Sequence, residues 1–351
     1  MMGKLKKLTG YRLFLPLSCL IIVLLINLIT TPTFFRITIN NGVLYGYIID
    51  VINRASELVV LAVGMTLVVS ASAGTDISVG AVMAVAAAVC TRVLAGGEVS
   101  VNEYANPYVL AVLAALAAAV VCGGFNGFLV AKLKIQPMVA TLILFTAGRG
   151  ISQLVTNVQI TYIRVDGYKL LGNNIPGIPI PTPIFVAVIV VVLTYILLKK
   201  TAMGMYIQSV GINERASRLV GLKSVKIIWM AYAFCGLCAG IAGLVASSRI
   251  YSADANNIGL NMELDAIAAV ALGGNSLGGG RFSLLGSVIG AYTIQALTTT
   301  LYAMSVPADQ IPVYKAIVVI LIVAVQSEEL KKFRKRLASR HSSKNVEGGV
   351  A

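Results

Sequence analysis

The stretch T-P-I-F-V-A-V-I-V-V-V-L-T-Y-I-L-L, residues 182–198, decides the fold class. It carries no charged side chain, and its length falls in the range of about 17 to 25 residues that lets an α-helix cross the hydrocarbon core of a membrane. Similar apolar runs recur in both directions along the chain. They lie near 13–30, 56–73, 77–95, 108–131, 137–157, 226–248, 262–278, 283–303 and 311–327. The pattern predicts an all-α membrane protein with ten transmembrane helices.

The composition agrees with a chain that lies mostly in lipid. Of its 351 residues, 58% are hydrophobic and only 12% are charged, and the mean hydropathy is +0.87. These values are typical of a polytopic membrane protein and not of a soluble enzyme. We therefore expect residues 1–351 to form one transmembrane domain.

The basic residues predict its orientation. With ten spans both termini lie on one side, and most of the 28 Lys and Arg residues fall there, in the tails 1–12 and 328–351, the 131–136 turn and the 199–226 loop. Because Lys and Arg concentrate in short cytoplasmic loops, both termini are predicted to be cytoplasmic. The net charge of +14 could also suggest nucleic acid. These residues flank apolar spans in short runs, however, so they fit contact with lipid headgroups better, and no nucleic-acid partner is expected.

The first apolar run follows the basic residues Lys4 to Arg12, which is also the layout of a signal peptide. It lacks an A-x-A-like cleavage site before Thr31. A retained first helix is therefore expected.

Cysteine and histidine offer little material for chemistry. The only histidine, His341, lies in the charged C-terminal tail. Cys235 and Cys238 form a C-x-x-C pair, but they sit among glycines in an apolar run, where small residues usually mark a helix-packing face. All five cysteines fall within predicted spans or at their edges, namely Cys19, Cys90, Cys122, Cys235 and Cys238. No metal site and no histidine-based catalysis are expected.

A short polar island, G-I-N-E-R-A-S-R-L-V-G-L, occupies residues 211–222 of the 199–226 loop. Asn213 can cap a helix, Glu214 suits its first turn, and Gly221 can end it. This predicts a helix of roughly two turns, about 12 Å long. Its apolar side chains fall on one side, at Ile212, Ala216 and Leu219, and its charged side chains point elsewhere, at Glu214, Arg215 and Arg218. Glu214 and Arg218 have i,i+4 spacing. The helix is therefore expected to present a face to another protein.

Two glycine-rich breaks interrupt the apolar sequence. The first is S-A-G-T-D-I-S-V-G, residues 72–80, and the second is G-G-N-S-L-G-G-G-R-F, residues 273–282. Non-helical backbone is tolerated at membrane depth only where protein or water satisfies its polar groups. Both breaks are therefore expected to end half-helices that are buried in the bundle or lie beside a pathway. The two segments share a pattern and not residues, so they do not establish an internal repeat.

The second break does not match a phosphate-binding loop. With Gly274 and Gly279 on the two glycines of G-x-x-x-x-G-K-[ST], Gly280 falls where the lysine is required. The register shifted by one residue has Asn275 for the first glycine and Phe282 for the Ser or Thr. Neither register can cradle a triphosphate and magnesium, so this chain is not expected to hydrolyse ATP.

Five charged residues lie within or near the predicted spans, where charge is costly and often functional. Asp76, in the first break, is expected to cap the following helix, with solute contact as the alternative. Arg149, Glu263 and Asp265 lie near predicted outer ends and are expected to snorkel, and Lys315 lies in the last span.

Neutral polar residues are more numerous in the spans than carboxylates are. A carrier coupled to protons or sodium usually needs buried acids, whereas a lining of amides and hydroxyls fits an uncharged solute such as a sugar. Hydrogen bonds between helices are an equally good account of any one of these residues. Thr141 and Thr298 belong to this group, and the candidate pathway residues are Thr66, Ser70, Thr75, Asp76, Ser78, Asn126, Gln153, Asn157, Asn275 and Gln295.

Further features concern packing and outward loops. Small residues spaced four apart predict close helix contact at Gly123 and Gly127, at Gly236 and Gly240, and at Gly286 and Gly290. Irregular regions at 31–54, 158–181 and 249–261 face outward in the predicted topology. They are candidate docking surfaces or plain connectors.

Several segments together resemble one family, the permease subunits of bacterial ABC sugar importers of the ribose and xylose type, and the chain is most similar to a galactofuranose-type permease subunit. The resemblance covers residues 52–327. It rests on A-V-G-M-T-L-V-V (62–69), G-T-D-I-S-V-G-A-V-M-A (74–84), N-G-F-L-V-A-K-L-K-I-Q-P-M-V-A-T-L (126–142), A-G-R-G (147–150), K-T-A-M-G-M-Y-I-Q-S-V-G-I-N-E-R-A-S-R-L-V-G (200–221), A-D-A-N-N-I-G-L-N-M-E-L-D-A-I-A-A-V (253–270) and G-G-N-S-L-G-G-G-R-F (273–282).

The resemblance implies a monosaccharide importer in the bacterial inner membrane that works by alternating access. Its implied partners are a cytoplasmic ABC ATPase, a periplasmic sugar-binding protein and a second permease subunit, identical or homologous. No cofactor is implied on this chain. The family usually has Ile-Asp-Leu where this sequence has Thr75, Asp76 and Ile77, which bears on the sugar more than on the fold. The implied ATPase-coupling residues are Asn213, Glu214, Arg215, Ala216, Arg218 and Gly221.

Two other classes of protein stay open at the level of sequence. An ion-coupled secondary carrier for a small polar solute would need no ATPase. A membrane-embedded hydrolase or transferase would need a nucleophile paired with a base, and no such pairing is evident in the spans.

Overall fold

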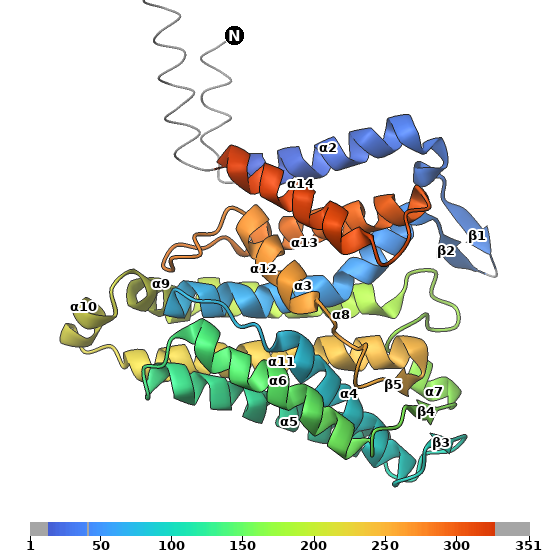
Figure 1. Cartoon of the computed structure of the whole chain (residues 1–351), viewed down its shortest axis with the longest axis horizontal. Coiled ribbons are helices and arrows are strands. Elements are labelled where there is room, and N and C mark those ends of the chain that lie inside the picture. Colours follow the sequence, from blue (N-terminus) through green and yellow to red (C-terminus); the bar gives the residue numbers. More distant parts are fainter. Residues whose placement is uncertain (1–12, 41, 327–351) are drawn as a thin grey trace, which may run out of the picture.

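The computed structural model describes residues 13–40 and 42–326. The predicted tails 1–12 and 328–351, and with them His341, lie outside these ranges. The chain folds as a helical bundle (Figure 1). Its longer helices are α2 (Phe14–Thr30), α3 (Tyr47–Ser72), α4 (Val79–Ala95), α5 (Tyr108–Ala131), α6 (Pro137–Val155), α8 (Thr182–Lys200), α9 (Met203–Ile212), α11 (Ser224–Ile250), α12 (Met262–Leu272), α13 (Leu284–Ala303) and α14 (Ile311–Gln326).

Short elements close the two ends of the bundle. The 3-10 helix η1 (Pro32–Phe35), the hairpin β1 (Thr38–Asn40) and β2 (Val43–Tyr45), and α7 (Asp166–Lys169) lie at one end with a small sheet of β3 (Ser100–Val101), β4 (Thr161–Ile163) and β5 (Ser252–Ala253). In that sheet β4 pairs parallel with β3 and antiparallel with β5. The helix α10 (Glu214–Leu219) lies at the opposite end (Figure 1).

Helix α3 is the centre of the bundle. In its most apolar window 89% of the residues are buried, against 17% in α8, so α3 faces protein and α8 lies at the periphery. It packs against α11, α13, α8 and α12, while α11 also packs against α5 and α4. Because lipid is as apolar as the side chains, this packing depends on close fit between helices and not on removal of apolar surface from water.

Six described helices are long and apolar enough to cross a membrane: α3, α5, α6, α8, α11 and α13. The helices α2, α4 and α14 are apolar but shorter. This establishes a polytopic membrane protein, whereas the count of ten spans and the cytoplasmic termini stay predictions.

Two predicted boundaries are wrong. The span expected at 262–278 ends at Leu272, because the glycines of the second break give a non-helical segment from Gly273. The outward region expected at 31–54 is helical from Tyr47 onward, since α3 extends beyond its apolar core.

The predicted small-residue contacts are confirmed. A Cβ atom added at Gly236 would lie 2.4 Å from the carbonyl oxygen of Ala119, and one at Gly123 would lie 2.4 Å from that of Tyr232. The same test at Gly290 gives 2.0 Å to the carbonyl oxygen of Ala269. Backbones therefore touch where α5 crosses α11 and where α13 crosses α12. The C-x-x-C pair serves packing too, since Gly64 of α3 lies against Cys235 and Cys238.

We expect Gly236→Ala to lower the thermal stability of the protein, because the methyl group cannot fit without separating α5 from α11. Overpacking of this kind costs about 1–3 kcal/mol. The matched control is Gly150→Ala on α6, where a Cβ meets no atom within 4 Å. Thermal unfolding in detergent measures both, and equal melting temperatures for the two variants would contradict the assignment of the crossing.

Candidate functional site

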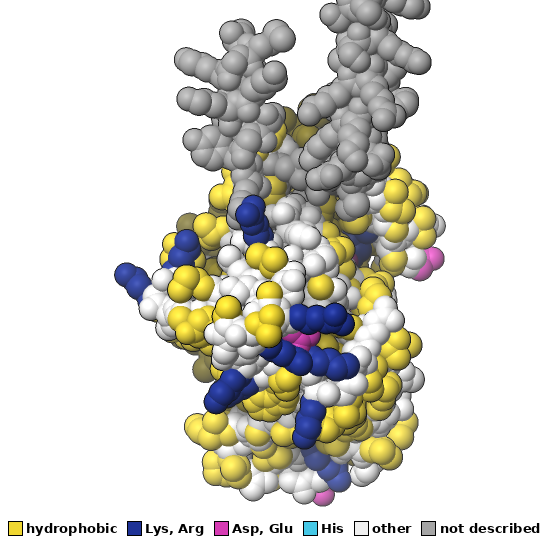
Figure 2. Space-filling view, turned by 90° about the vertical axis from the view of Figure 1, so that its left-hand side faces the viewer, with side chains coloured by type: hydrophobic (Ala, Val, Ile, Leu, Met, Phe, Trp, Pro, Cys, Tyr) yellow, Lys and Arg dark blue, Asp and Glu magenta, His cyan; other side chains and the backbone are white. Residues whose placement is uncertain are grey.

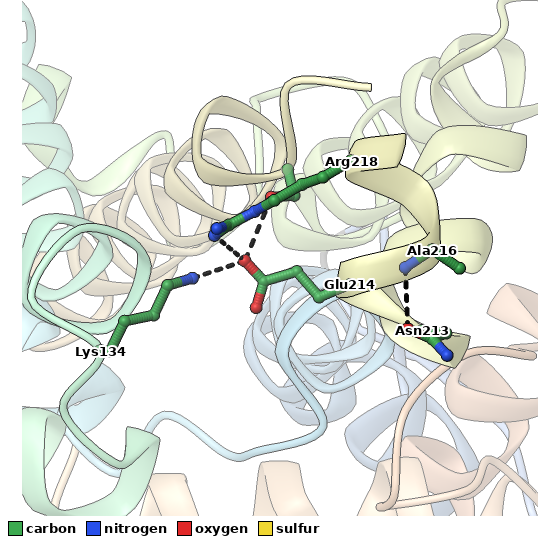
Figure 3. A network of polar contacts seen from close by, with 6 residues as sticks. Lys134, Asn213, Glu214, Ala216 and Arg218 are labelled. Atoms are coloured by element: carbon green, nitrogen blue, oxygen red, sulfur yellow. Dashed lines mark hydrogen bonds and ion pairs between the residues drawn. The ribbon is translucent and has the colours of Figure 1, made fainter. Parts of the chain in front are cut away.

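The polar island folds as predicted. Helix α10 spans Glu214–Leu219, and the Asn213 side chain caps it by accepting a hydrogen bond from the Ala216 amide at 3.0 Å (Figure 3). Gly221 follows with a φ of +86°, the left-handed conformation that glycine adopts without strain. The helix is somewhat shorter than the two turns expected. Helix α9, which precedes it, was not predicted and makes 10 residues of the 199–226 loop helical.

Glu214 is the centre of a charged network beneath α10 (Figure 3). Its Oε1 accepts from Lys134 Nζ at 2.5 Å and from Arg218 Nη2 at 2.5 Å. The same oxygen accepts from Ser224 Oγ at 3.1 Å, and Arg218 Nε donates to Ser224 Oγ at 2.7 Å. Lys134 lies in the turn between α5 and α6, and Ser224 begins α11. One carboxylate therefore ties α10 to two other parts of the bundle.

These contacts keep Glu214 ionised. Partial burial raises the pKa of its carboxyl group, but the hydrogen bond and charge of Lys134 and the hydrogen bonds from Ser224 and Arg218 outweigh that effect. The net result is a pKa below the ordinary value of 4.5.

The outer side of this segment is apolar and uncovered in the single chain. Leu219 is 89% exposed, Val220 76% and Ile212 67%. Lys and Arg side chains gather among apolar ones on this end of the molecule (Figure 2). Exposed apolar side chains on a helix that a charged network holds in place suit docking to another protein more than contact with a small solute.

The start of this segment touches the end of α3 and the second glycine-rich break. A Cβ at Gly211 would lie 1.7 Å from the carbonyl oxygen of Ser70, at the end of α3, and 2.7 Å from the Gly280 amide nitrogen. Gly280 itself donates its N–H to that Ser70 oxygen at 3.0 Å. Ala73, just beyond α3, lies against Gly279. Three segments distant in sequence therefore meet backbone to backbone below α10.

Asp76 stabilises the first break. The buried carboxylate accepts from the Ser78 amide at 2.9 Å and from Ser78 Oγ at 2.7 Å, directly before α4. Asn126 of α5 donates to Ser78 Oγ at 2.8 Å and lies 3.4 Å from the carboxylate. Ile77 donates its amide to Thr141 Oγ1 of α6 at 3.2 Å. Asp76 therefore has a structural role, but it does not cap α4 as predicted: the N-cap residue is Ser78, which makes no side-chain cap hydrogen bond, and Asp76 instead holds the turn before it.

A second network closes the other break. Asn275 donates to Ser287 Oγ of α13 at 2.8 Å and accepts from the Ser283 amide at 2.5 Å. Ser287 Oγ also bonds Thr66 Oγ1 of α3 at 2.6 Å, and Ser70 Oγ donates to the Thr66 carbonyl. Thr66, Ser70 and Asn275 thus share one buried cluster between α3 and α13.

The ten candidate pathway residues do not meet at one place. Thr75, Asp76, Ser78 and Asn126 surround the first break, and the buried Thr75 Oγ1 has no hydrogen-bond partner among the described residues. Three others lie apart from both clusters. Gln153 bonds Asn256 near the strand-bearing end, Asn157 follows the end of α6, and Gln295 bonds Thr299 within α13.

The snorkelling expectation is wrong for the charged residues of the later spans. Glu263 is only 4% exposed. Asp265 pairs with Lys315 at 2.7 Å, which joins α12 to α14. Arg149 donates to the carbonyl oxygens of Ala255 and Ile258. Burial of Glu263, the ion pair to α14 and the contacts of Arg149 with the segment before α12 take the place of the lipid interface that the expectation assumed.

Sequence reasoning missed Lys134, Ser224, Ser287 and Gly280 as members of these networks. In the sequence, Lys134 stood out only as one of the many basic loop residues that predict the orientation of the chain in the membrane. Gly280 carried a signal only as part of the second glycine-rich break. Ser224 and Ser287 were indistinguishable from ordinary small residues, because their roles depend on contacts between different segments of the chain.

Comparison with known proteins identifies the family. Residues 47–326 match the family model described as "Branched-chain amino acid transport system / permease component". The chain belongs to this family. It is 44% identical over 324 residues to the galactofuranose transporter permease protein YtfT of Escherichia coli K12, covering 92% of each chain. It is 37% identical to the fructose import permease protein FruF of Bifidobacterium longum, over 99% of this chain and 96% of the relative.

A third relative is the ribose import permease protein RbsC of E. coli K12, 35% identical over 89% of this chain and 93% of the relative. No solved structure matches the chain. The predicted family is therefore confirmed: the relatives are permease subunits, and the apolar helices make this chain a multi-pass inner-membrane protein.

We expect the backbone amides of residues 214–222 to exchange hydrogen more slowly in the native sequence, where Glu214 is ionised, than in the variant Glu214→Gln. Because its folded pKa is depressed, this stabilisation is present above the ordinary pKa of 4.5 and is lost as pH falls through the lower folded value. For a partly exposed network the difference is about 0.5–1 kcal/mol. Hydrogen–deuterium exchange of both proteins from pH 7 to a pH well below the folded value measures it. A difference that persists unchanged at that low pH would contradict the network, and Glu98→Gln at the other end is the control.

Proposed function

We propose that this chain is the membrane permease subunit of an ATP-driven importer that carries a monosaccharide, galactofuranose-, ribose- or xylose-like, by alternating access. The family match and the sugars named for the relatives support the substrate class. The single observation that carries the mechanism is the docking segment of residues 211–222, whose outer face is exposed and whose first residue touches the end of α3 and the second break.

The proposed partner at this segment is a cytoplasmic ABC ATPase on a separate chain. Leu219 and Val220 would enter its surface, with Arg215 at the rim, while Glu214 holds the segment rigid through Lys134 and Arg218. Asn213, Ala216 and Gly221 set the start and end of α10. Closure of the ATPases on binding ATP would then displace the segment as a body.

The contacts of Gly211 supply the route for that displacement. Backbone atoms at Gly211 lie against Ser70 and Gly280 with no side chain between them, so little movement is lost at this joint. The motion would reach the end of α3 and the second break together. Solute is proposed to pass beside the clusters of Thr66, Ser70 and Asn275 and of Thr75, Asp76, Ser78 and Asn126, with Gln153, Asn157 and Gln295 further along.

The remaining parts of the proposed importer lie outside this chain. With ten spans and cytoplasmic termini, the β1–β2 hairpin and the β3–β4–β5 sheet face a periplasmic sugar-binding protein. A second permease subunit, identical or homologous, completes the complex.

We expect Leu219→Asp to weaken assembly with the ATPase by about tenfold or more, because full burial of a leucine contributes about 1.5–3 kcal/mol. Charge reversal at Glu214 and Arg218 is expected to impair both assembly and uptake. Co-purification of the ATPase and sugar uptake by proteoliposomes measure these effects. Unchanged assembly and uptake in all variants would refute the docking assignment, and uptake by this chain alone under an ion gradient would favour an ion-coupled carrier.

We expect Gly211→Ala to separate assembly from transport. The docking face stays intact, so the ATPase still co-purifies, but the added methyl group displaces the segment from Ser70 and uptake falls several-fold. The control is Gly278→Ala in the second break, where the nearest atom to a Cβ is 3.5 Å away. Normal uptake by Gly211→Ala would show that the joint does not transmit the motion.

A further inference from the structure

A groove of about 370 Å³ lies where α5 ends and α11 begins, at the end of the bundle that carries α10. Apolar side chains of Phe128, Val225 and Trp229 line it, and three lysines stand at its margin: Lys132, Lys223 and Lys226. It is separate from the exposed apolar side chains at Leu219 and Val220. We name these six residues the lysine groove.

The three lysines form a cationic site without an acidic partner. All three are exposed, and among the described residues none makes an ion pair. Lys134, two residues from Lys132, is by contrast paired with Glu214. Lys132 Nζ lies 5.6 Å from the centre of the Phe128 ring, at the boundary of the apolar surface. Three lysine side chains that border one groove and lack an acidic partner favour an anionic group at its margin.

The apolar lining continues along α5, away from the lysines. Phe128, Phe125 and Val121 are spaced three and four residues apart, so they share one helix face, and they are 41%, 45% and 70% exposed. This face leads from the lysines into the predicted membrane region of α5. An anion bound at the lysines would therefore be followed by apolar surface in the direction of the hydrocarbon core.

Two glycines allow Trp229 to lie directly on α5. A Cβ at Gly127 would be 3.1 Å from Trp229 Cδ1, and one at Gly124 would be 3.3 Å from its Cζ2. The Nε1 side of the indole therefore contacts the helix, and Trp229 is still 42% exposed. Tryptophan is enriched at this depth, where a ring meets both headgroups and acyl chains.

We propose that the lysine groove binds an anionic phospholipid of the phosphatidylglycerol class. The headgroup phosphate lies between Lys132, Lys223 and Lys226, and an acyl chain follows Phe128, Phe125 and Val121. Basic pockets between transmembrane helices on the cytoplasmic side bind anionic headgroups in this way. A soluble phosphate or an acidic protein surface would use the lysines but not the apolar track. The assignment does not depend on which solute the protein carries.

The chain contains one tryptophan, which makes the site directly observable. The full chain is reconstituted in phosphatidylcholine nanodiscs that contain equal fractions of brominated phosphatidylglycerol or brominated phosphatidylcholine, and Trp229 fluorescence is measured. We expect brominated phosphatidylglycerol to quench more strongly. The preference should fall by about fivefold for each lysine replaced by glutamine, and it should decrease with added salt.

Matched variants separate a specific site from general charge. The triple variant Lys132→Gln, Lys223→Gln, Lys226→Gln should lose the preference, and the corresponding triple Arg variant should keep it, which excludes misfolding as the cause. The variant Lys199→Gln, Lys200→Gln removes two basic residues at the end of α8 and should keep it as well.

Three outcomes would overturn the proposal. Equal quenching by the two brominated lipids in the native sequence would show that no selective lipid site exists. Loss of the preference on addition of soluble glycerol phosphate, when sodium chloride of the same ionic strength leaves it intact, would assign the lysines to a free phosphate. Loss of the ATPase from the triple Gln variant with unchanged lipid preference would assign them to a protein partner.

Discussion

The structure depends on one constraint of the membrane: backbone polar groups that leave a helix there must find partners within the protein. Both glycine-rich breaks meet it with specific donors and acceptors. Asp76 and Thr141 accept amides of the first break, at Ser78 and Ile77. Asn275 accepts the Ser283 amide, and Ser70 accepts that of Gly280. The ends of α3, α4, α12 and α13 are thereby joined, and the docking segment contacts the same place at Gly211.

The same contacts are the basis of the proposed response of this chain to ATP that binds on a partner. A flexible loop would absorb the movement of a partner. Here Glu214 fixes α10 to the α5–α6 turn and to α11, and Gly211 places backbone against backbone at the breaks. The stiffness comes from several modest interactions and from the absence of compressible side chains at the joint. The lysine groove lies beside this segment, so the bound lipid would adjoin the part proposed to move.

Local signals in the sequence were sufficient for the fold class, the family, the cap at Asn213 and the small-residue crossings, because each depends on composition or on residues a few positions apart. The same signals misplaced the end of α12 and the environment of Glu263, since the non-helical second break and the protein partners of buried acids are set by tertiary contacts. From the sequence, ten polar residues were predicted to line one solute pathway. The structure distributes these residues over two buried clusters and the strand-bearing end, which hydrophobic periodicity cannot resolve.

The central claim is that the docking segment and the second break move together. Spin labels are placed at Met205 of α9, the helix whose last two residues begin the docking segment, and at Leu277 of the break, both exposed positions. Their separation is measured by pulsed electron resonance in the assembled importer. A second pair, Met205 and Val109 at the start of α5, reports motion across the bundle. We predict that ATP changes the Met205–Val109 distance and leaves the Met205–Leu277 distance constant. A change of several ångströms between Met205 and Leu277 would contradict the account.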